Sequence, residues 1–119
     1  MTDNSNDVDK KPPQNPCSES RLVYEVMQEL GKHGAVYRCN AGSVKLPNGK
    51  RFNGMPKGFA DVMVVLSGGR VCFVECKVGV GKLSVEQARF IERMRALGCR
   101  AGVARSINDA VEICGINNA

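Results

Sequence analysis

The spacing of apolar residues changes along the chain from helical to strand-like and back, and these changes predict the elements of the fold. In residues 18–33 apolar side chains recur every three or four positions, which is typical of a helix with one buried side. Gly34 ends this helix, and a short strand follows over 35–39. Residues 44–52 then predict a small hairpin or loop that turns at Asn48-Gly49.

The middle of the chain predicts the clearest hairpin. Residues 61–66 (DVMVVL) and 70–77 (RVCFVECK) have strand-like patterns, and Ser-Gly-Gly joins them. If this connection is a three-residue loop with a left-handed glycine, Asp61 lies opposite Glu75. A tighter two-residue turn would place Asp61 opposite Cys76, on the other face of the sheet. The loop type therefore decides whether the two carboxylates meet.

The C-terminal third alternates in the same way. Ser84 opens a helix that runs through Leu97 and is closed by a glycine. Residues 100–104 predict a short strand, and Ser106 caps a last helix that ends before Gly115. This order predicts an α/β domain with one mixed sheet flanked by helices.

Residues 1–17 are polar and contain three prolines, so we expect a disordered tail followed by one domain over 18–119. No apolar run approaches the roughly 20 residues that span a bilayer. The polar, acidic start of the chain does not resemble a signal peptide. We therefore expect a soluble intracellular protein without a membrane partner.

The six cysteines favour reduced thiols over disulfides or a zinc site. They form no Cys-x-x-Cys pair, and the chain has a single histidine. Most of them stand among apolar neighbours, where a thiol behaves as a small buried apolar group. This indicates a reducing compartment such as the cytoplasm.

Two helices carry a polar residue on their predicted apolar faces. Glu19 begins the stripe that continues through Val23, Val26 and Leu30, so we expect it to point inward. A first-turn acid that complements the helix dipole is the alternative. Gln87 projects from the face formed by Phe90, Ile91, Met94 and Leu97, although the capping box Ser-x-x-Gln also accounts for it without any chemistry.

Charged residues also end the second strand of the hairpin. Glu75 and Lys77 share a face with Val71 and Phe73, which we expect to be buried. Opposed carboxylates repel in a purely structural sheet, so Asp61 facing Glu75 would favour a divalent cation between them. An exposed salt bridge would explain Glu75 and Lys77 alone.

Together with Glu19 and Gln87, these groups converge on one end of the sheet. Carboxylate oxygens suit Mg²⁺ or Mn²⁺, which readily keep water and phosphate oxygens as further ligands. A lysine beside such an ion can orient the attacking water or stabilise charge that develops on a phosphate. The pattern therefore predicts phosphodiester hydrolysis.

The formal net charge of +5 favours a polyanionic partner, and one segment concentrates that charge. Residues 32–60 contain no acidic residue and six basic ones. Basic side chains on a glycine-rich segment suit contact with the phosphate backbone, whereas a solvated loop usually mixes both signs. The predicted DNA contacts are Arg38, Asn40, Lys45, Lys50, Arg51, Lys57 and Lys82. Few aromatic residues accompany them, so base stacking is not the leading mode.

At these residues the sequence resembles a known family. The D…E-x-K pattern of Asp61, Glu75 and Lys77 is that of the PD-(D/E)XK nucleases, with Ala60 where the proline would stand. The surrounding motifs are similar to those of the VRR-NUC (virus-type replication-repair nuclease) domain over residues 19–110. They are Arg38-x-Asn-x-Gly42, Gly58-Phe-Ala-Asp61-Val62, Val74-Glu-Cys-Lys77, Gly81-Lys-Leu-Ser-x-x-Gln87 and Gly98…Val103-Ala-Arg-Ser106.

The resemblance implies a restriction-endonuclease-like αβββαβ core and metal-dependent DNA cleavage. Asp61 and Glu75 would be metal ligands with the Cys76 carbonyl as a third, and Lys77 would be the catalytic lysine. Gln87 would be an accessory residue and Glu19 the first-helix acid. Short standalone viral or bacterial members resemble Holliday-junction resolvases and form homodimers.

Rival functions remain at this point. Nothing in the sequence predicts a recognition helix or an arginine set for reading base edges, so we expect selectivity for DNA structure rather than sequence. A flap, single-strand or restriction-like nuclease would use the same catalytic residues. A non-cleaving DNA-binding module is the remaining alternative.

Overall fold

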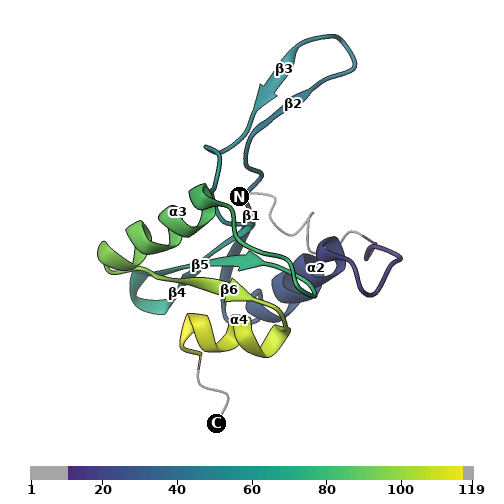
Figure 1. Cartoon of the computed structure of the whole chain (residues 1–119). Coiled ribbons are helices and arrows are strands. Elements are labelled where there is room, and N and C mark those ends of the chain that lie inside the picture. The colour runs from purple at the N-terminus through teal and green to yellow at the C-terminus, as the bar shows by residue number, and fades with distance from the viewer. Residues whose placement is uncertain (1–10, 117–119) are drawn as a thin grey trace.

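The computed structural model describes residues 11–116, apart from the side chains of residues 43 and 44 (Figure 1). The elements are helix α2 (Glu19–Leu30), strands β1 (Gly34–Arg38), β2 (Ser43–Lys45), β3 (Arg51–Asn53) and β4 (Val62–Leu66), the 3-10 turn η1 (Ser67–Gly69), strand β5 (Arg70–Cys76), helix α3 (Val85–Ala96), strand β6 (Arg100–Ala104) and helix α4 (Ile107–Cys114). The predicted order of helices and strands is confirmed.

The segment before α2 includes part of the predicted tail. Residues 1–10 lie outside the described part of the chain, whereas 11–17 contain no helix or strand. Arg21 on α2 donates a hydrogen bond to the carbonyl of Pro13 at 3.1 Å, so this later part of the segment contacts the domain. None of the helices in the described range 11–116 is long and apolar enough to cross a membrane.

Four strands form a mixed sheet in the order β1-β4-β5-β6. The pairs β1–β4 and β4–β5 are antiparallel, and β5–β6 is parallel. Because β5 and β6 run in the same direction, both end at the same edge of the sheet, and α3 forms the crossover between them. The predicted mixed α/β fold is confirmed.

Helices cover both faces of this sheet (Figure 1). The helices α2 and α4 pack on one face, over a core that includes Val26, Val64 and Val74. The helix α3 packs on the other face, where Phe73 contacts Phe90 edge-on, with ring centroids 5.1 Å apart. Strand β5 lies between the two cores, so its residues 72–76 are all buried. Any charged side chain in this stretch is therefore enclosed on its own face.

The connection between β4 and β5 has the three-residue form. Val62 lies opposite Val74 and Leu66 opposite Arg70, and η1 joins the strands. Gly68 has a φ of 80°, which residues with a Cβ rarely adopt, and a glycine there allows this turn. Continuing the register by one residue places Asp61 opposite Glu75. The two-residue alternative is wrong.

The prediction for the end of α3 needs a correction. Leu97 was expected on the apolar face of the helix, but 61% of it is exposed. The helix ends at Ala96, and Leu97 is its C-cap, with a φ of −85° and a ψ of 0°. The helical wheel no longer applies there, because the chain has already turned away from the sheet.

Strands β2 and β3 form an antiparallel hairpin, the arm, which extends from the body of the domain (Figure 1). The turn lies where the sequence predicts it. Leu46 donates its backbone N–H to the carbonyl of Lys50 at 2.7 Å, and Gly49 has a φ of 85°. At the base of the arm, Gly58 lies so close to the backbone of Glu86 on α3 that an added Cβ would come within 2.6 Å of it. The arm is thus anchored beside the start of α3.

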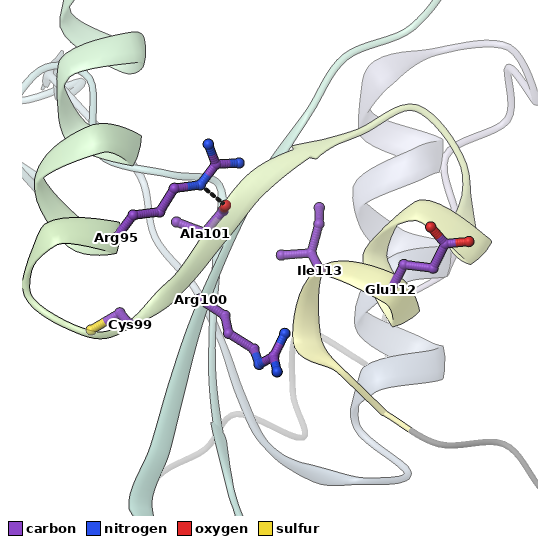
Figure 2. Close-up of a pocket in the computed structure, with 6 residues that line it drawn as sticks. All are labelled: Arg95, Cys99, Arg100, Ala101, Glu112 and Ile113. Carbon is purple, nitrogen blue, oxygen red and sulfur yellow. Dashed lines mark hydrogen bonds between the residues drawn. The ribbon is translucent and has the colours of Figure 1, made fainter.

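The outer strand β6 is bound by a side chain from α3. The Nε of Arg95 donates to the carbonyl of Ala101 at 2.7 Å, across a groove of about 340 Å³ that Arg100, Glu112 and Ile113 also line (Figure 2). An edge strand offers unpaired backbone groups to other chains, and this bond occupies one of them.

All six cysteines are free. The thiols of Cys72, Cys76 and Cys114 are buried in the core under α2 and α4.

Candidate active site

Glu75 is the one buried polar or charged residue among those the structure describes, with 2% of its surface exposed. Strand β5 places it on the α3 face, one step beyond Phe73. Its Oε2 accepts a hydrogen bond from Nε2 of Gln87 at 2.9 Å. Its Oε1 is buried and has no hydrogen-bond partner. A buried carboxylate oxygen without a partner is costly, which makes Glu75 a candidate for binding a ligand.

Asp61 comes just before β4 and is held at both its backbone and its side chain. Its carbonyl accepts the N–H of Cys39 at 2.8 Å, and its Oδ2 accepts the N–H of Cys76 at 2.9 Å. That side-chain bond uses one of its two carboxylate oxygens. The structure therefore brings Asp61 and Glu75 together, as the register predicts.

The pKa of Glu75 is raised to about 7. Burial is the largest cause, and the negative charge of Asp61 is the second. Lys77 acts in the opposite direction, with its Nζ at 3.7 Å from Oε2 of Glu75. This distance exceeds that of a hydrogen bond, so the Lys77 ammonium and the carboxylate form an ion pair without a direct hydrogen bond.

Gln87 caps α3 and also contacts Glu75. Ser84 and Gln87 form the capping box, since the N–H of Ser84 donates to Oε1 of Gln87 at 2.9 Å and the N–H of Gln87 donates to Oγ of Ser84 at 3.1 Å. The side-chain nitrogen of Gln87 remains available and donates to Glu75. The cap thus fixes the amide that orients the carboxylate.

Glu19 does not point inward, and that expectation is wrong. It is exposed at the first residue of α2, ahead of the first buried position, Leu22. A helical wheel assigns a face, but at the first turn this face has not yet reached the core. Glu19 is still close enough for its charge to raise the pKa of Glu75. It stands at the rim of the site.

The donor set suits a hard divalent cation with few protein ligands. Asp61 and Glu75 provide two carboxylates, and one buried oxygen of Glu75 has no partner. In the described part of the chain no three His, Cys, Asp or Glu side chains gather to form a metal cluster. Mg²⁺ commonly binds one or two carboxylates and keeps several waters, so this pair fits Mg²⁺ or Mn²⁺ better than zinc.

The residues predicted to contact DNA are all exposed and come from several elements. Lys45, Lys50 and Arg51 lie on the arm, and Lys57 is 3.9 Å from Glu86 at the base of the arm. Arg38 and Asn40 lie at and just after the end of β1, and Lys82 lies between β5 and α3. The basic side chains are therefore spread over the surfaces that flank the site.

One residue beside the site has no role in the sequence-based interpretation. Arg105, within the motif Val103-Ala-Arg-Ser106, donates from its guanidinium to the carbonyls of Gly79 and Gly81. Its position directly after β6, the parallel neighbour of β5, is the signal that could have indicated this contact.

The fold and the site together define a class of protein. A mixed αβββαβ core with opposed carboxylates and a lysine at one end of the sheet is the arrangement expected of a PD-(D/E)XK nuclease. A family model described as the VRR-NUC domain matches residues 4–108. This chain belongs to the VRR-NUC family, a nuclease family of the PD-(D/E)XK type.

A solved structure is also similar. It is described as a VRR_NUC domain, is 25% identical, and has a TM-score of 0.57. The similarity covers 82% of this chain and 95% of the other. No curated protein sequence matches this chain.

Proposed function

We propose that this protein is a Mg²⁺- or Mn²⁺-dependent endonuclease that hydrolyses phosphodiester bonds in branched DNA. The observation that supports this most strongly is the buried, unpaired Oε1 of Glu75 beside Asp61. A carboxylate with a purely structural role is usually exposed or has hydrogen-bond partners for both oxygens. The Oε1 of Glu75 is neither exposed nor hydrogen-bonded.

Asp61 and Glu75 would hold the ion, with the carbonyl of Cys76 as the proposed third ligand. When bound, the ion supplies Lewis-acid polarisation of a phosphate oxygen and lowers the pKa of a bound water. Gln87 keeps Glu75 in one orientation through its 2.9 Å hydrogen bond. Glu19 contributes negative charge at the rim of the site.

Lys77 acts on the reacting groups themselves. Its side chain is 15% exposed, so the ammonium is mostly shielded from bulk water. It orients the attacking water or donates to the phosphate oxygen that gains charge, as the bond from water to phosphorus forms and the bond to the leaving sugar oxygen breaks. Such a contact is strongest in the transition state, which is the requirement for catalysis.

The proposed DNA contacts lie on the arm and around its base. Six basic residues and no acidic residue within 32–60 favour the phosphate backbone, whatever the base sequence. The arm extends beyond the domain, so its lysines contact DNA outside the cleavage site (Figure 1). An extended contact of this kind favours DNA with more than one duplex arm.

A homodimer would supply the two cleavage sites that symmetric incision of a four-way junction needs. The arm and its base expose Leu46, Phe52 and Met55, to 38%, 55% and 39%. Apolar side chains clustered on a projecting hairpin support a contact with a second copy. We place that contact within residues 43–59.

The test is cleavage of a labelled substrate panel: four-way junctions, flaps, nicked duplexes and single strands, each with Mg²⁺ or Mn²⁺. The proposal expects junctions to be cut fastest, and cleavage to stop with a chelator. Cleavage confined to flaps or single strands would support the flap or single-strand alternative. Cutting of intact duplex at defined sequences would support a restriction-like nuclease.

The variant Lys77→Ala separates a nuclease from a DNA-binding module. We expect it to lose cleavage while its folding and DNA affinity stay close to those of the wild type, because other basic residues still contact phosphates. Binding of DNA without any cleavage by the wild type, with either ion, would identify a non-cleaving module. Wild-type rates in the variant would show that Lys77 is structural.

A further inference from the structure

The segment that leaves β5 runs beside the side chain of Lys77. The N–H of Lys77 donates to the carbonyl of Ala104 at 3.1 Å, so this is the last residue that the sheet holds. The chain then turns over 78–81, the site turn, which is closed by a 3.0 Å bond from the N–H of Gly81 to the carbonyl of Val78. Lys82 follows it and is exposed.

One guanidinium holds both sides of the site turn. Arg105 donates from Nη1 to the carbonyl of Gly79 at 2.9 Å and from Nη2 to the carbonyl of Gly81 at 2.8 Å. The residue between these carbonyls, Val80, is 94% exposed and makes little contact that could hold the turn. A planar fork with two donors suits two fixed acceptors, which a lysine could not satisfy in the same way.

Arg105 is itself fixed by the start of α4. Its own N–H donates to Oδ2 of Asp109 at 2.9 Å, and the N–H of Asp109 donates to Oγ of Ser106 at 3.1 Å. At the near end of the turn, Val78 packs against the core under α2 and α4. The site turn is therefore attached at one end to the core and at the other to α4 through Arg105.

The site turn lies against the side chain of Lys77. A Cβ built on Gly81 would be 3.6 Å from Cδ of Lys77 and 3.8 Å from its Cβ, which is ordinary contact distance. The ammonium forms an ion pair with Glu75 but no hydrogen bond to it, because Nζ is 3.7 Å from Oε2. A lysine stem has several rotatable bonds, so its direction depends on the surfaces beside it.

We propose that Arg105 is a positioning residue: by holding the site turn against Lys77, it directs the Lys77 ammonium toward the scissile phosphate. This rests on the proposed function of Lys77. Without the fork the turn loosens, and Lys77 remains present but is no longer held in the productive direction. Misplacement by about 1 Å can cost a reaction on the order of 100-fold.

The test compares Arg105→Ala and Arg105→Lys with Gly81→Ala, whose added methyl group would come within 3.1 Å of the carbonyl of Val78 and so disturb the site turn without changing any charge. Arg70→Ala is the matched control, since Arg70 also donates to a backbone carbonyl, that of Ser67 at 3.4 Å, at the opposite end of β5. For the first three variants we expect the single-turnover rate at saturating DNA to fall by about tenfold or more, with DNA affinity nearly unchanged. The control should match the wild type in both.

Two kinetic outcomes would overturn the proposal. If Arg105→Ala weakens DNA binding and leaves the saturating rate unchanged, Arg105 contacts a phosphate directly. If Arg105→Lys behaves as the wild type, a positive charge is sufficient and the fork has no role. A Gly81→Ala protein with an unchanged rate would likewise show that the site turn does not direct Lys77.

A second readout is independent of cleavage. In protein whose lysines carry ¹³C-methyl labels, the Lys77 signal, identified with Lys77→Arg, should move in Arg105→Ala and Gly81→Ala but not in Arg70→Ala. An unmoved Lys77 signal would overturn the positioning role. If the wild type cleaves no DNA, the proposed function fails, and this spectrum still decides what Arg105 does.

Discussion

Among single residues, Glu75 lowers the stability of the fold most clearly. Glu75 is buried, one of its oxygens is unpaired, and Asp61 adds like charge beside it. Replacing it with glutamine keeps its size and its acceptor for Gln87 but removes the buried charge. Active sites commonly trade stability for function in this way. The cost of Glu75 to the stability of the fold can be measured, because the shifted pKa of its carboxyl makes that cost depend on pH.

The pKa of Glu75, raised to about 7 from the usual 4.5, fixes the sign of this dependence. The folded state binds the proton more tightly than the unfolded state, so the contribution to stability is full below pH 4.5 and is lost as the pH rises through about 7. At pH 8 we expect the melting temperature of the metal-free wild type to lie a few degrees below that of Glu75→Gln. At pH 5 this difference in melting temperature should narrow or reverse. Thermal denaturation with a chelator measures both.

Adding Mg²⁺ at pH 8 is the companion measurement. It should raise the melting temperature of the wild type and leave that of Glu75→Gln nearly unchanged, because binding to the folded state alone stabilises it. Equal increases in the melting temperatures of the two proteins would show that the ion binds elsewhere.

At the scale of elements, most of the fold could be predicted because the signals were local. Ser84 and Ser106 cap their helices as the sequence indicates, and the Ser-Gly-Gly connection sets the register that brings Asp61 to Glu75. The errors fall at helix ends. The direction of Glu19 and the burial of Leu97 depend on where each helix stands relative to the sheet, which periodicity does not encode.

Some contacts of the site also lay beyond sequence reasoning. The bond from Gln87 to Glu75 and the fork of Arg105 join segments that are distant in sequence. Predicting them requires the parallel pairing of β5 and β6 first. The sequence indicates that Asp61, Glu75, Lys77 and Gln87 converge, whereas the hydrogen bonds that orient them appear only once the strands are placed.

The arm carries lysines that we propose contact the DNA backbone. Replacing Lys45 and Lys50 with alanine should lower DNA affinity and reduce the slope of log affinity against log salt by about one to two, roughly one for each lost phosphate contact. The single-turnover rate at saturating DNA should not change, since neither residue lies near Glu75. An unaltered salt dependence would remove the arm from the DNA-binding surface.

For the whole molecule, we predict that two copies of the chain form a homodimer through the arm. We expect sedimentation at micromolar concentration to give a dimer, and Phe52→Asp to weaken it, because a charge would replace an apolar side chain in the contact. Val80→Asp is the control, since Val80 is 94% exposed but lies away from the arm. A monomer that stays unpaired with junction DNA would favour flap or single-strand cleavage.

The position of Cys76 has a consequence for how the protein loses activity. Its thiol is fully buried in the core, while its neighbours Glu75 and Lys77 face the opposite side of the sheet, and its N–H is held by Asp61. The site therefore shares its backbone with the most enclosed part of β5. Amide hydrogen exchange at residues 74–76 should occur only through global unfolding, as slowly as anywhere in the chain. Gentle heating or mild denaturant should accordingly unfold the arm well before it disturbs the carboxylates of Asp61 and Glu75.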